Sequence, residues 1–153
     1  LRYDADDRAD CRVLGDPLQL REAMNNLVSN ALKFSPSGST VEVAVRRSTD
    51  TVRFSVTDSG PGLSEREQDR LFEPLCNVGP DPTDGEGSTG LGLYIARRIV
   101  EEHEGTVEVE SEKGSGSTFR FTLPAASSPA SPAPHADRSG SEWSSPSSAP
   151  ALP

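Results

Sequence analysis

The sequence predicts a two-layer α/β sandwich of the α+β type, in which helices cover one face of a sheet built from antiparallel hairpins. Strands with alternating apolar residues occur in adjacent pairs with short connections, and segments with the three-and-four spacing of helices separate the pairs. Parallel neighbours would need long crossovers between consecutive strands, so this order fits a doubly wound parallel sheet less well. We therefore expect one helical layer packed on one sheet.

The first helix is predicted over residues 17–34. Asp16 supplies a capping side chain, and Pro17 needs no N–H at the first helical position. The apolar residues of this segment are spaced as on one buried helix face: Leu20, Ala23, Met24, Leu27, Val28 and Ala31. Ser35 and Pro36 are expected to end the helix.

A short helix and a second long helix are predicted further along the chain. Ser64 and Glu67 form a capping box that opens a helix ending near residues 72–74. The second long helix is expected over about 90–103, with Gly105 as its stop. Residues 75–89 contain several Gly and Pro with few apolar anchors, so we expect a mobile loop that is long enough to act as a lid.

Four strands are predicted from alternating apolar residues. They cover residues 40–46, 51–57, 106–111 and 117–123. The first two are joined by a turn at 48–50 and the last two by a glycine-rich connection, so each pair is expected to form a hairpin.

The chain divides by composition into a folded domain and a tail. Residues 1–123 are expected to form the domain, and residues 124–153 are expected to be a disordered tail rich in Pro, Ser and Ala. The chain begins at Leu1 without a Met, so we interpret it as part of a longer protein.

Charge and hydropathy exclude several classes of function. The chain has 15 Lys plus Arg against 24 Asp plus Glu, and an acidic domain without a basic stripe is a poor nucleic-acid binder. No apolar run approaches the roughly 20 residues that span a bilayer, and no signal segment opens the chain. Cys11 and Cys76 are expected to be reduced thiols. We expect a cytoplasmic segment with no nucleic-acid or membrane partner, although the parent chain could still be anchored in a membrane.

One face of the first predicted helix carries a line of polar residues: Glu22, Asn26, Asn30 and Lys33. Asn is a poor helix former, so two of them four residues apart suggest another task for their amide oxygens. A hard cation such as Mg²⁺ accepts neutral oxygens beside phosphate oxygens, and Lys33 could reach the same phosphates. A solvated polar face is the alternative for any one of these residues.

Two glycine pairs lie where a loop could approach a ligand closely. Gly60 and Gly62 follow a strand, and Gly90 and Gly92 open a helix around Leu91. The second pair lacks the Lys of a phosphate loop and the third Gly of a dinucleotide-binding loop. Backbone N–H groups at a helix start can still face an anion, although a simple turn is the alternative.

Asp58 ends a strand of the buried type, immediately before the first glycine pair. A carboxylate at this place can accept a hydrogen bond from the exocyclic amine of adenine, whereas the carbonyl of guanine would be repelled. This predicts selection of ATP over GTP. A turn-capping Asp is the alternative.

Four motifs now carry a resemblance to bacterial sensor histidine kinases. The segments that resemble the N, G1, F and G2 boxes of that family are, in order, Asn26–Phe34, Asp58–Gly62, Leu71–Pro74 and Gly87–Leu93. The resemblance implies the Bergerat ATP-binding fold, with a mixed sheet, helices on one face and a flexible ATP lid. Gyrase, the Hsp90 chaperones and MutL mismatch-repair proteins share that fold.

The resemblance also implies which residues contact Mg-ATP. They are Asn26, Asn30, Lys33, Phe34, Asp58, Gly60, Gly62, Leu63, Gly90, Leu91, Gly92 and Thr118. By position, Asn30 would hold Mg²⁺ with Asn26 as its helper, and Lys33 would contact phosphate. Phe34 would pack against the adenine, whose amine Asp58 would hold. Asn26, Asn30 and Lys33 would thus be the residues nearest to catalysis.

Two further positions follow from the same resemblance. Thr118 would place a hydroxyl near Asp58. His103 would be a structural residue at the end of the last helix rather than a phosphoacceptor. Because an acidic domain must hold ATP without a basic surface, binding should depend strongly on magnesium.

The resemblance implies a protein-histidine kinase of a two-component system. ATP-hydrolysing relatives carry a Glu where this chain has Asn26, and an amide cannot accept the proton of a nucleophile. The domain is therefore expected to hold ATP while a His on a dimerisation domain outside this sequence attacks, with a response-regulator receiver domain as an indirect partner. The alternative is a non-catalytic nucleotide-binding regulatory module of the same fold, because residues 76–85 lack a basic residue.

Overall fold

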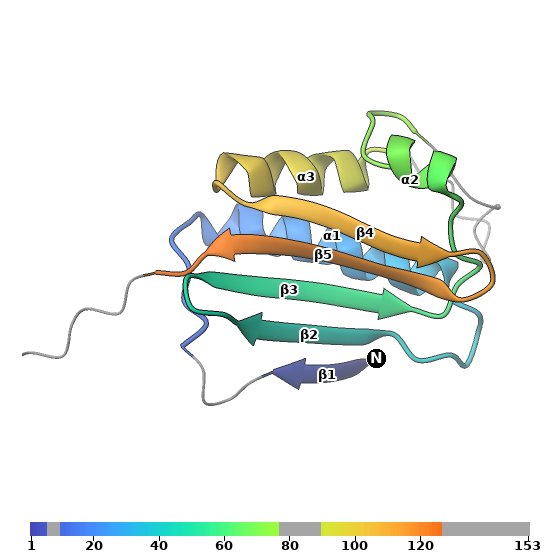
Figure 1. Cartoon of the computed structure of the whole chain (residues 1–153), viewed down its shortest axis with the longest axis horizontal. Helices are drawn as coiled ribbons and strands as arrows, with labels where there is room; N and C mark the ends of the chain where they lie inside the picture. Colours follow the sequence, from blue (N-terminus) through green and yellow to red (C-terminus); the bar gives the residue numbers. More distant parts are fainter. Residues whose placement is uncertain (6–9, 77–89, 127–153) are drawn as a thin grey trace, which may run out of the picture.

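A computed structural model describes residues 1–5, 10–76 and 90–126 of the chain. Within these residues, three helices and one five-stranded sheet form two layers, with α1 and α3 on the same face of the sheet (Figure 1). The elements in chain order are β1 (Arg2–Ala5), α1 (Pro17–Phe34), β2 (Glu42–Arg47), β3 (Thr51–Asp58), α2 (Glu65–Arg70), α3 (Gly92–Glu102), β4 (Thr106–Glu112) and β5 (Gly116–Pro124). The predicted fold class is confirmed.

The sheet is mixed, with the strand order β1-β2-β3-β5-β4. β1 runs parallel to β2, and all other neighbours are antiparallel. The two predicted hairpins, β2–β3 and β4–β5, meet through the pairing of β3 with β5, which brings Asp58 opposite Ser117. Within the described residues, none of the helices combines the length and the apolar character that a membrane span requires.

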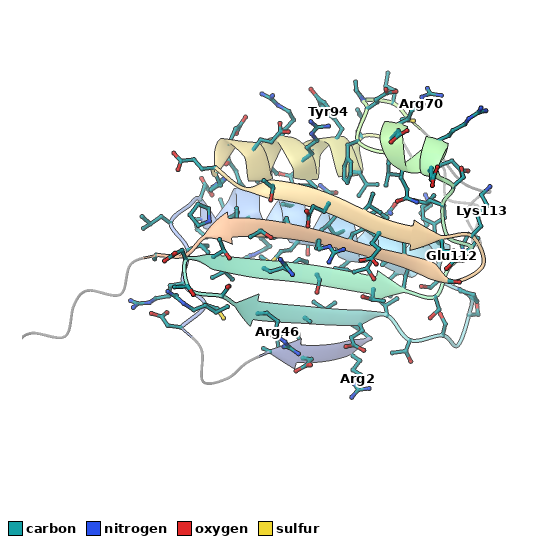
Figure 2. The ribbon with its side chains drawn as sticks, in the orientation of Figure 1. Arg2, Arg46, Arg70, Tyr94, Glu112 and Lys113 are labelled. Carbon is teal, nitrogen blue, oxygen red and sulfur yellow. The ribbon has the colours of Figure 1, made fainter. Side chains whose placement is uncertain are left out.

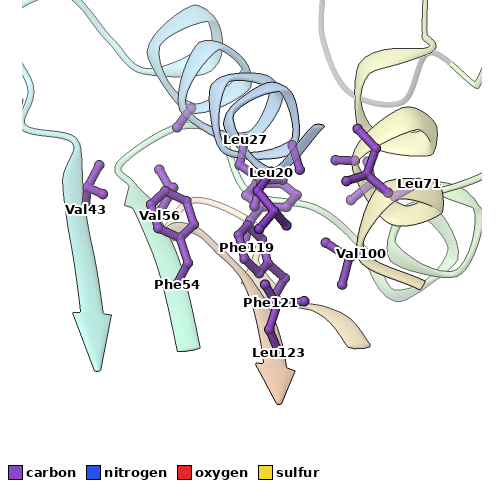
Figure 3. Packing of buried hydrophobic residues seen from close by; sticks show 14 of the residues in the cluster. Leu20, Leu27, Val43, Phe54, Val56, Leu71, Val100, Phe119, Phe121 and Leu123 are labelled. Atoms are coloured by element: carbon purple, nitrogen blue, oxygen red, sulfur yellow. The ribbon is translucent and has the colours of Figure 1, made fainter. Parts of the chain in front are cut away.

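The core lies between the sheet and the two long helices (Figure 3). Leu27 of α1 and Val100 of α3 are completely buried, and the rings of Phe54 and Phe121 stack with centroids 5.1 Å apart. Alternate residues of β3 and β5 point into this core, so the intervening residues lie on the face that the helices leave uncovered.

The predicted caps of α1 and α2 are present. The carboxylate of Asp16 accepts hydrogen bonds from the amides of Leu18 and Gln19 at 2.7 and 3.2 Å. Ser64 and Glu67 form the capping box of α2, in which the Ser64 amide donates to the Glu67 carboxylate at 2.7 Å. These two helices therefore begin where their sequences predict.

The last helix differs from its predicted limits at both ends. α3 begins at Gly92 because Gly90 has a φ of 65°, a left-handed conformation that interrupts a helix. At the other end, Glu104 rather than Gly105 adopts the left-handed conformation, with a φ of 58°. Gly105 serves close packing instead, because a Cβ there would lie 2.5 Å from the Thr122 carbonyl oxygen.

Strand β1 was not predicted. Its side chains are mostly exposed and show no alternation between buried and exposed positions, so the signal that identifies the other strands is absent. The strand is defined instead by its parallel pairing with β2, which places Arg2 opposite Glu42. It adds an edge strand to the predicted hairpins.

Hydrogen-bonded structure continues past residue 123. The amide of Ala125 donates to the Asp50 carbonyl and that of Ala126 to the Arg12 carbonyl, both at 2.8 Å. Val13 and Ala125 form an isolated antiparallel bridge. Most of the predicted lid, and the predicted tail from residue 127 onward, lie outside the described residues.

Candidate nucleotide-binding site

Asp58 lies at the end of β3, on the side of the sheet that the helices cover. Only 5% of its surface is exposed, and its Oδ1 accepts a hydrogen bond from the Gly60 amide at 2.8 Å. Burial raises the pKa of the Asp58 carboxyl above its ordinary value of 3.8, and the backbone amides of Gly60 and Ser117 oppose part of this effect. A buried acceptor of this kind suits a ligand that donates hydrogen bonds.

The loop after Asp58 is fixed to the turn between β4 and β5. Gly62 has a φ of 67°, and a Cβ at this position would collide with the carbonyl oxygen of Glu112. The Gly114 amide donates to the Pro61 carbonyl at 2.8 Å. Leu63 is buried in the core, and its amide donates to Ser111 at 2.7 Å. Gly62 is therefore needed for contact between two backbones.

Charged side chains hold the same turn to α2. Figure 2 shows Glu112 and Lys113 at the end of the hairpin that lies beside this helix. The Nζ of Lys113 lies 3.3 Å from the Glu67 carboxylate. Hydrogen bonds from Ser64, helped by Lys113, lower the pKa of Glu67 to about 2. Glu67 of the capping box thus also forms an ion pair with Lys113.

The C-terminal end of α1 meets Asp58 at Gly60. A Cβ on Gly60 would lie 2.8 Å from both the Phe34 carbonyl oxygen and the Asp58 carboxylate. Phe34 itself is half-buried. The first glycine pair therefore lies with Asp58, Phe34 and Leu63. We call the group of Asp58, Gly60, Gly62 and Ser117 the Asp58 end of the site.

Gly92, of the second glycine pair, meets the polar face of α1. A Cβ on Gly92 would lie 3.3 Å from Asn26 Oδ1, so the first turn of α3 packs closely against this side chain. The Nδ2 atom of Asn26 is buried and has no hydrogen-bond partner within the described part of the chain. Asn30 and Lys33, the next residues of the predicted polar line, are half-buried.

The start of α3 differs from the starts of the other two helices. Leu91 is its N-cap residue, and no side chain caps the N-terminal amides among the described residues. The left-handed Gly90 precedes it. Amides at a helix start carry a partial positive charge and bind anions readily. We call Asn26, Asn30, Gly90 and Gly92 the Asn26 end of the site.

Thr118 does not lie with Asp58, contrary to the prediction. Its hydroxyl meets that of Thr57 at 3.1 Å on the uncovered face of the sheet. Ser117 is the residue paired with Asp58, and it is buried on the helix-covered face. The reason is the alternation of strands, because a shift of one residue moves a side chain to the opposite face.

Sequence reasoning also missed two residues that shape the Asp58 end. The hydroxyl of Ser111 contacts the Leu63 amide, the Gly116 carbonyl oxygen and the Ser117 hydroxyl, the last two at 2.9 Å. A Cβ on Gly116 would collide with the carbonyl oxygen of Asp58. Ser111 lies on the same face of β4 as Val107 and Val109, the apolar residues of that strand. This alternation is the signal that could have identified it.

Both ring nitrogens of His103 are engaged at the far ends of the two long helices. Nδ1 donates to the Ile99 carbonyl at 2.7 Å, and Nε2 accepts from the Asp16 amide at 3.0 Å. Gly15 packs against the ring so closely that a Cβ there would collide with it. This geometry agrees with the predicted structural role and joins the start of α1 to the end of α3.

Comparison with known proteins defines the class to which this fold and site belong. Residues 15–127 match the family model of the histidine kinase-, DNA gyrase B-, and HSP90-like ATPases, and the chain belongs to that family. The relatives described below are named as sensor kinases. The chain spans less than a third of the length of the curated relatives that it matches.

Two curated relatives are the sensor-like histidine kinase SenX3 of Mycobacterium tuberculosis and the adaptive-response sensory kinase SasA of Prochlorococcus marinus. Each is 42% identical to this chain, over 74% and 73% of the chain and 28% and 29% of the relative, respectively. The chain thus corresponds to the ATP-binding catalytic domain of sensor histidine kinases.

Solved structures lead to the same domain. The mycobacterial sensor histidine kinase MprB has a TM-score of 0.69 at 27% identity, covering 80% of this chain and 79% of that one. Full-length ShkA in complex with AMPPNP also has a TM-score of 0.69, at 31% identity, covering 82% of this chain and 26% of that one. The shared fold is therefore that of a kinase catalytic domain.

Proposed function

We propose that this domain binds Mg-ATP and transfers its γ-phosphoryl group to a histidine on the dimerisation domain of a sensor histidine kinase. The observation that supports this best is the uncapped start of α3 against Asn26, whose buried amide nitrogen has no partner among the described residues. Helix N-termini attract anions, and a triphosphate is the anion that the family's chemistry uses.

In this proposal the Asp58 end binds the base. The Asp58 carboxylate accepts a hydrogen bond from the adenine amine, and Gly60 and Gly62 allow the base to approach the backbone. Leu63 and Phe34 provide apolar surface for the ring. Ser117, rather than Thr118, supplies the hydroxyl beside Asp58, because it is the residue paired with Asp58 on the covered face.

The Asn26 end binds the phosphates and their metal. The described residues contain no group of three or more His, Cys, Asp or Glu side chains that could hold a metal by themselves. Asn26 and Asn30 can instead supply amide oxygens to Mg²⁺ that arrives with the triphosphate, which suits an ion that prefers few protein ligands and phosphate oxygens. The buried Nδ2 of Asn26 is a donor, so its partner in this proposal is a phosphate oxygen. Lys33 and the backbone amides from Gly90 to Gly92 bind the phosphate oxygens.

For phosphoryl transfer, the domain has mainly to position ATP and to stabilise the negative charge on its phosphates. The imidazole nitrogen of the acceptor forms a bond to the γ-phosphorus, the bond from that phosphorus to the bridging oxygen breaks, and ADP leaves. Magnesium, when bound, offsets the negative charge on the phosphates. Asn26 cannot accept a proton, so this chain has no base at that position to activate water. Transfer to an external histidine is therefore favoured over hydrolysis.

The acceptor histidine belongs to the partners of this domain. Since both ring nitrogens of His103 are engaged within the fold, we place the acceptor on a dimerisation domain outside this sequence. A response-regulator receiver domain would take the phosphoryl group from that histidine. The domain would work in the cytoplasm, where ATP is available.

The test combines this domain with the dimerisation domain of its own parent chain and ATP labelled in the γ-phosphate. We expect acid-labile, base-stable label on the dimerisation domain, and none when Asn30→Ala replaces the parent domain. Tight binding of Mg-ATP without label would contradict transfer and favour a non-catalytic regulatory module. Absence of Mg-ATP binding would contradict the site assignment as well.

A further inference from the structure

Ser111 lies at the point where three segments around Asp58 meet. It lies on the face of β4 that points toward the core. Its hydroxyl oxygen accepts a hydrogen bond at 2.7 Å from the amide of Leu63, in the loop after β3. The same hydroxyl contacts the Gly116 carbonyl oxygen and the Ser117 hydroxyl of β5, both at 2.9 Å. The Gln68 side chain of α2 also donates to the Ser111 carbonyl at 2.9 Å. One residue thus connects the glycine loop, both strands of the hairpin and α2.

The hydrogens of these groups can be placed by counting donors. A serine hydroxyl has one hydrogen and two acceptor lone pairs. The Gly116 carbonyl can only accept, so the Ser111 hydrogen is donated to it. One Ser111 lone pair takes the Leu63 amide hydrogen, and the other can take the hydroxyl hydrogen of Ser117. Only this arrangement satisfies all three contacts.

The direction of the Ser117 hydroxyl has a consequence next to Asp58. Ser117 is paired with Asp58 across β3 and β5, and both residues are buried on the covered face of the sheet. If Ser117 donates its hydrogen to Ser111, its oxygen keeps only lone pairs for other partners. This part of the covered face then has two kinds of acceptor side by side, the Asp58 carboxylate and the Ser117 hydroxyl oxygen.

We propose that Ser111 is a positioning residue for base selectivity. By holding the Ser117 hydroxyl hydrogen away from the base, it makes Ser117 and Asp58 a joint acceptor for the two N–H groups of a purine amine. A 6-oxo purine offers a carbonyl at that place, which neither oxygen can bind. This inference rests on the proposed binding of ATP, and it adds a residue that does not touch the nucleotide.

The experiment compares Ser111→Ala with Ser115→Ala, a matched control at an exposed position of the same turn. Dissociation constants are measured by calorimetry for Mg-ATP and for Mg-ITP, which carries a carbonyl in place of the amine. We expect the parent domain and Ser115→Ala to keep the same preference for ATP over ITP, and Ser111→Ala to lose about tenfold of it. Ser111→Thr, which keeps a hydroxyl, should restore the preference.

A purely structural role for Ser111 predicts a different result. In that case Ser111→Ala would weaken ATP and ITP equally, the ratio would be unchanged, and the inference would be overturned. If Ser111→Ala does not fold, Ser117→Ala tests the same point, because an unchanged ratio in that variant overturns it too. A parent domain that binds neither nucleotide would instead refute the proposed function.

Discussion

The two ends of the site differ in how far the protein already satisfies its own polar groups. At the Asp58 end, the Asp58 carboxylate accepts a hydrogen bond from the Gly60 amide. The Ser111 hydroxyl connects Ser117 to the loop that contains Gly62. At the Asn26 end, the Asn26 amide nitrogen is buried without a partner among the described residues, and no side chain there caps α3. One end is built in advance, whereas the other contains groups that a ligand could satisfy.

This difference indicates where selectivity and affinity arise. A buried polar group without a partner destabilises a fold by about 1–3 kcal/mol, and binding a ligand there recovers that free energy. Groups that already have partners gain less on binding but are fixed in direction, which favours discrimination between similar ligands. We therefore expect the Asp58 end to choose the base and the Asn26 end to provide much of the binding free energy.

The largest expected effect comes from disturbing the Asp58 end. Gly62→Ala should lower the free energy of unfolding by about 3 kcal/mol or more, because it combines a left-handed backbone with a collision against the Glu112 carbonyl. Urea denaturation measures this change. Gly114→Ala is the control, since its φ is 85° but nothing lies within 4 Å of its Cβ, and it should lose only about 1 kcal/mol.

Equal losses in these two variants would contradict the view that the loop is docked backbone to backbone. In that case the left-handed conformation alone would explain both values. The Asp58 end would then be less firmly prearranged than its hydrogen bonds suggest, and the contrast with the Asn26 end would weaken.

The second prediction concerns the Asn26 end. Asn26→Ala removes a buried amide nitrogen that has no partner among the described residues and introduces a better helix former, so the free energy of unfolding should stay the same or rise. The affinity for Mg-ATP should fall by about 100-fold, and the loss should shrink when magnesium is omitted. Titration calorimetry with and without magnesium, together with urea denaturation, measures both quantities.

Asn25→Ala is the matched control for this variant, because Asn25 is the exposed neighbour on the same helix. It should leave Mg-ATP binding unchanged. If Asn26→Ala binds as tightly as Asn25→Ala does, the phosphates do not lie at the Asn26 end, and the amide without a partner needs another explanation.

The third prediction uses the raised pKa of Asp58. An acid whose pKa is raised on folding stabilises the fold most when it is protonated, and this contribution is lost as the pH rises through the folded-state pKa. Asp58→Asn should therefore be more stable than the parent at neutral pH, with a difference that disappears in acid. Its Mg-ATP affinity should nevertheless fall by about tenfold, because a charge-assisted hydrogen bond to the amine is lost.

Urea midpoints from about pH 3 to about pH 7 check the stability, and calorimetry at neutral pH checks the affinity. A variant that is less stable than the parent at neutral pH would show that burial does not dominate the environment of Asp58. A variant that binds Mg-ATP as tightly as the parent would show that this carboxylate makes no hydrogen bond to the base.

Much of the fold could be predicted because its signals are local. The Asp16 cap, the Ser64 capping box and the alternating strands each depend on residues close in sequence. β1 could not be found in this way, because its exposed residues carry no pattern and its parallel partner lies about 40 positions away. Propensity does not specify which edge a short strand joins.

The candidate site was predictable in its types of residue but not in all its positions. Asp58 and the two glycine pairs were identified from the sequence, and the structure places Gly60 beside Asp58 and Gly92 beside Asn26. The prediction named Thr118, although Phe119 and Phe121 are the apolar residues of β5 that face the core. Ser117, not Thr118, lies on the same face of the strand as these two residues. Applying the alternation of the strand to its first polar residues would have corrected that choice.

The smallest effect is expected far from both ends, at His103. His103→Ala removes the acceptor of the Asp16 amide and the donor to the Ile99 carbonyl, so the free energy of unfolding should fall by about 1 kcal/mol. Glu102→Ala, an exposed neighbour whose carboxylate lies 3.8 Å from Arg98, should change it very little. Urea denaturation measures both.

Binding separates two interpretations of this contact. If the packing of α1 on α3 alone holds Asn26 against Gly92, then His103→Ala should bind Mg-ATP within about twofold of the parent, because hydrogen bonds distant from a site couple weakly to it. A tenfold loss would mean that the two helices are not rigidly packed and that His103 sets their relative position. The Asn26 end would then depend on a contact at the opposite ends of the same helices, whereas the Asp58 end is held by its own neighbours.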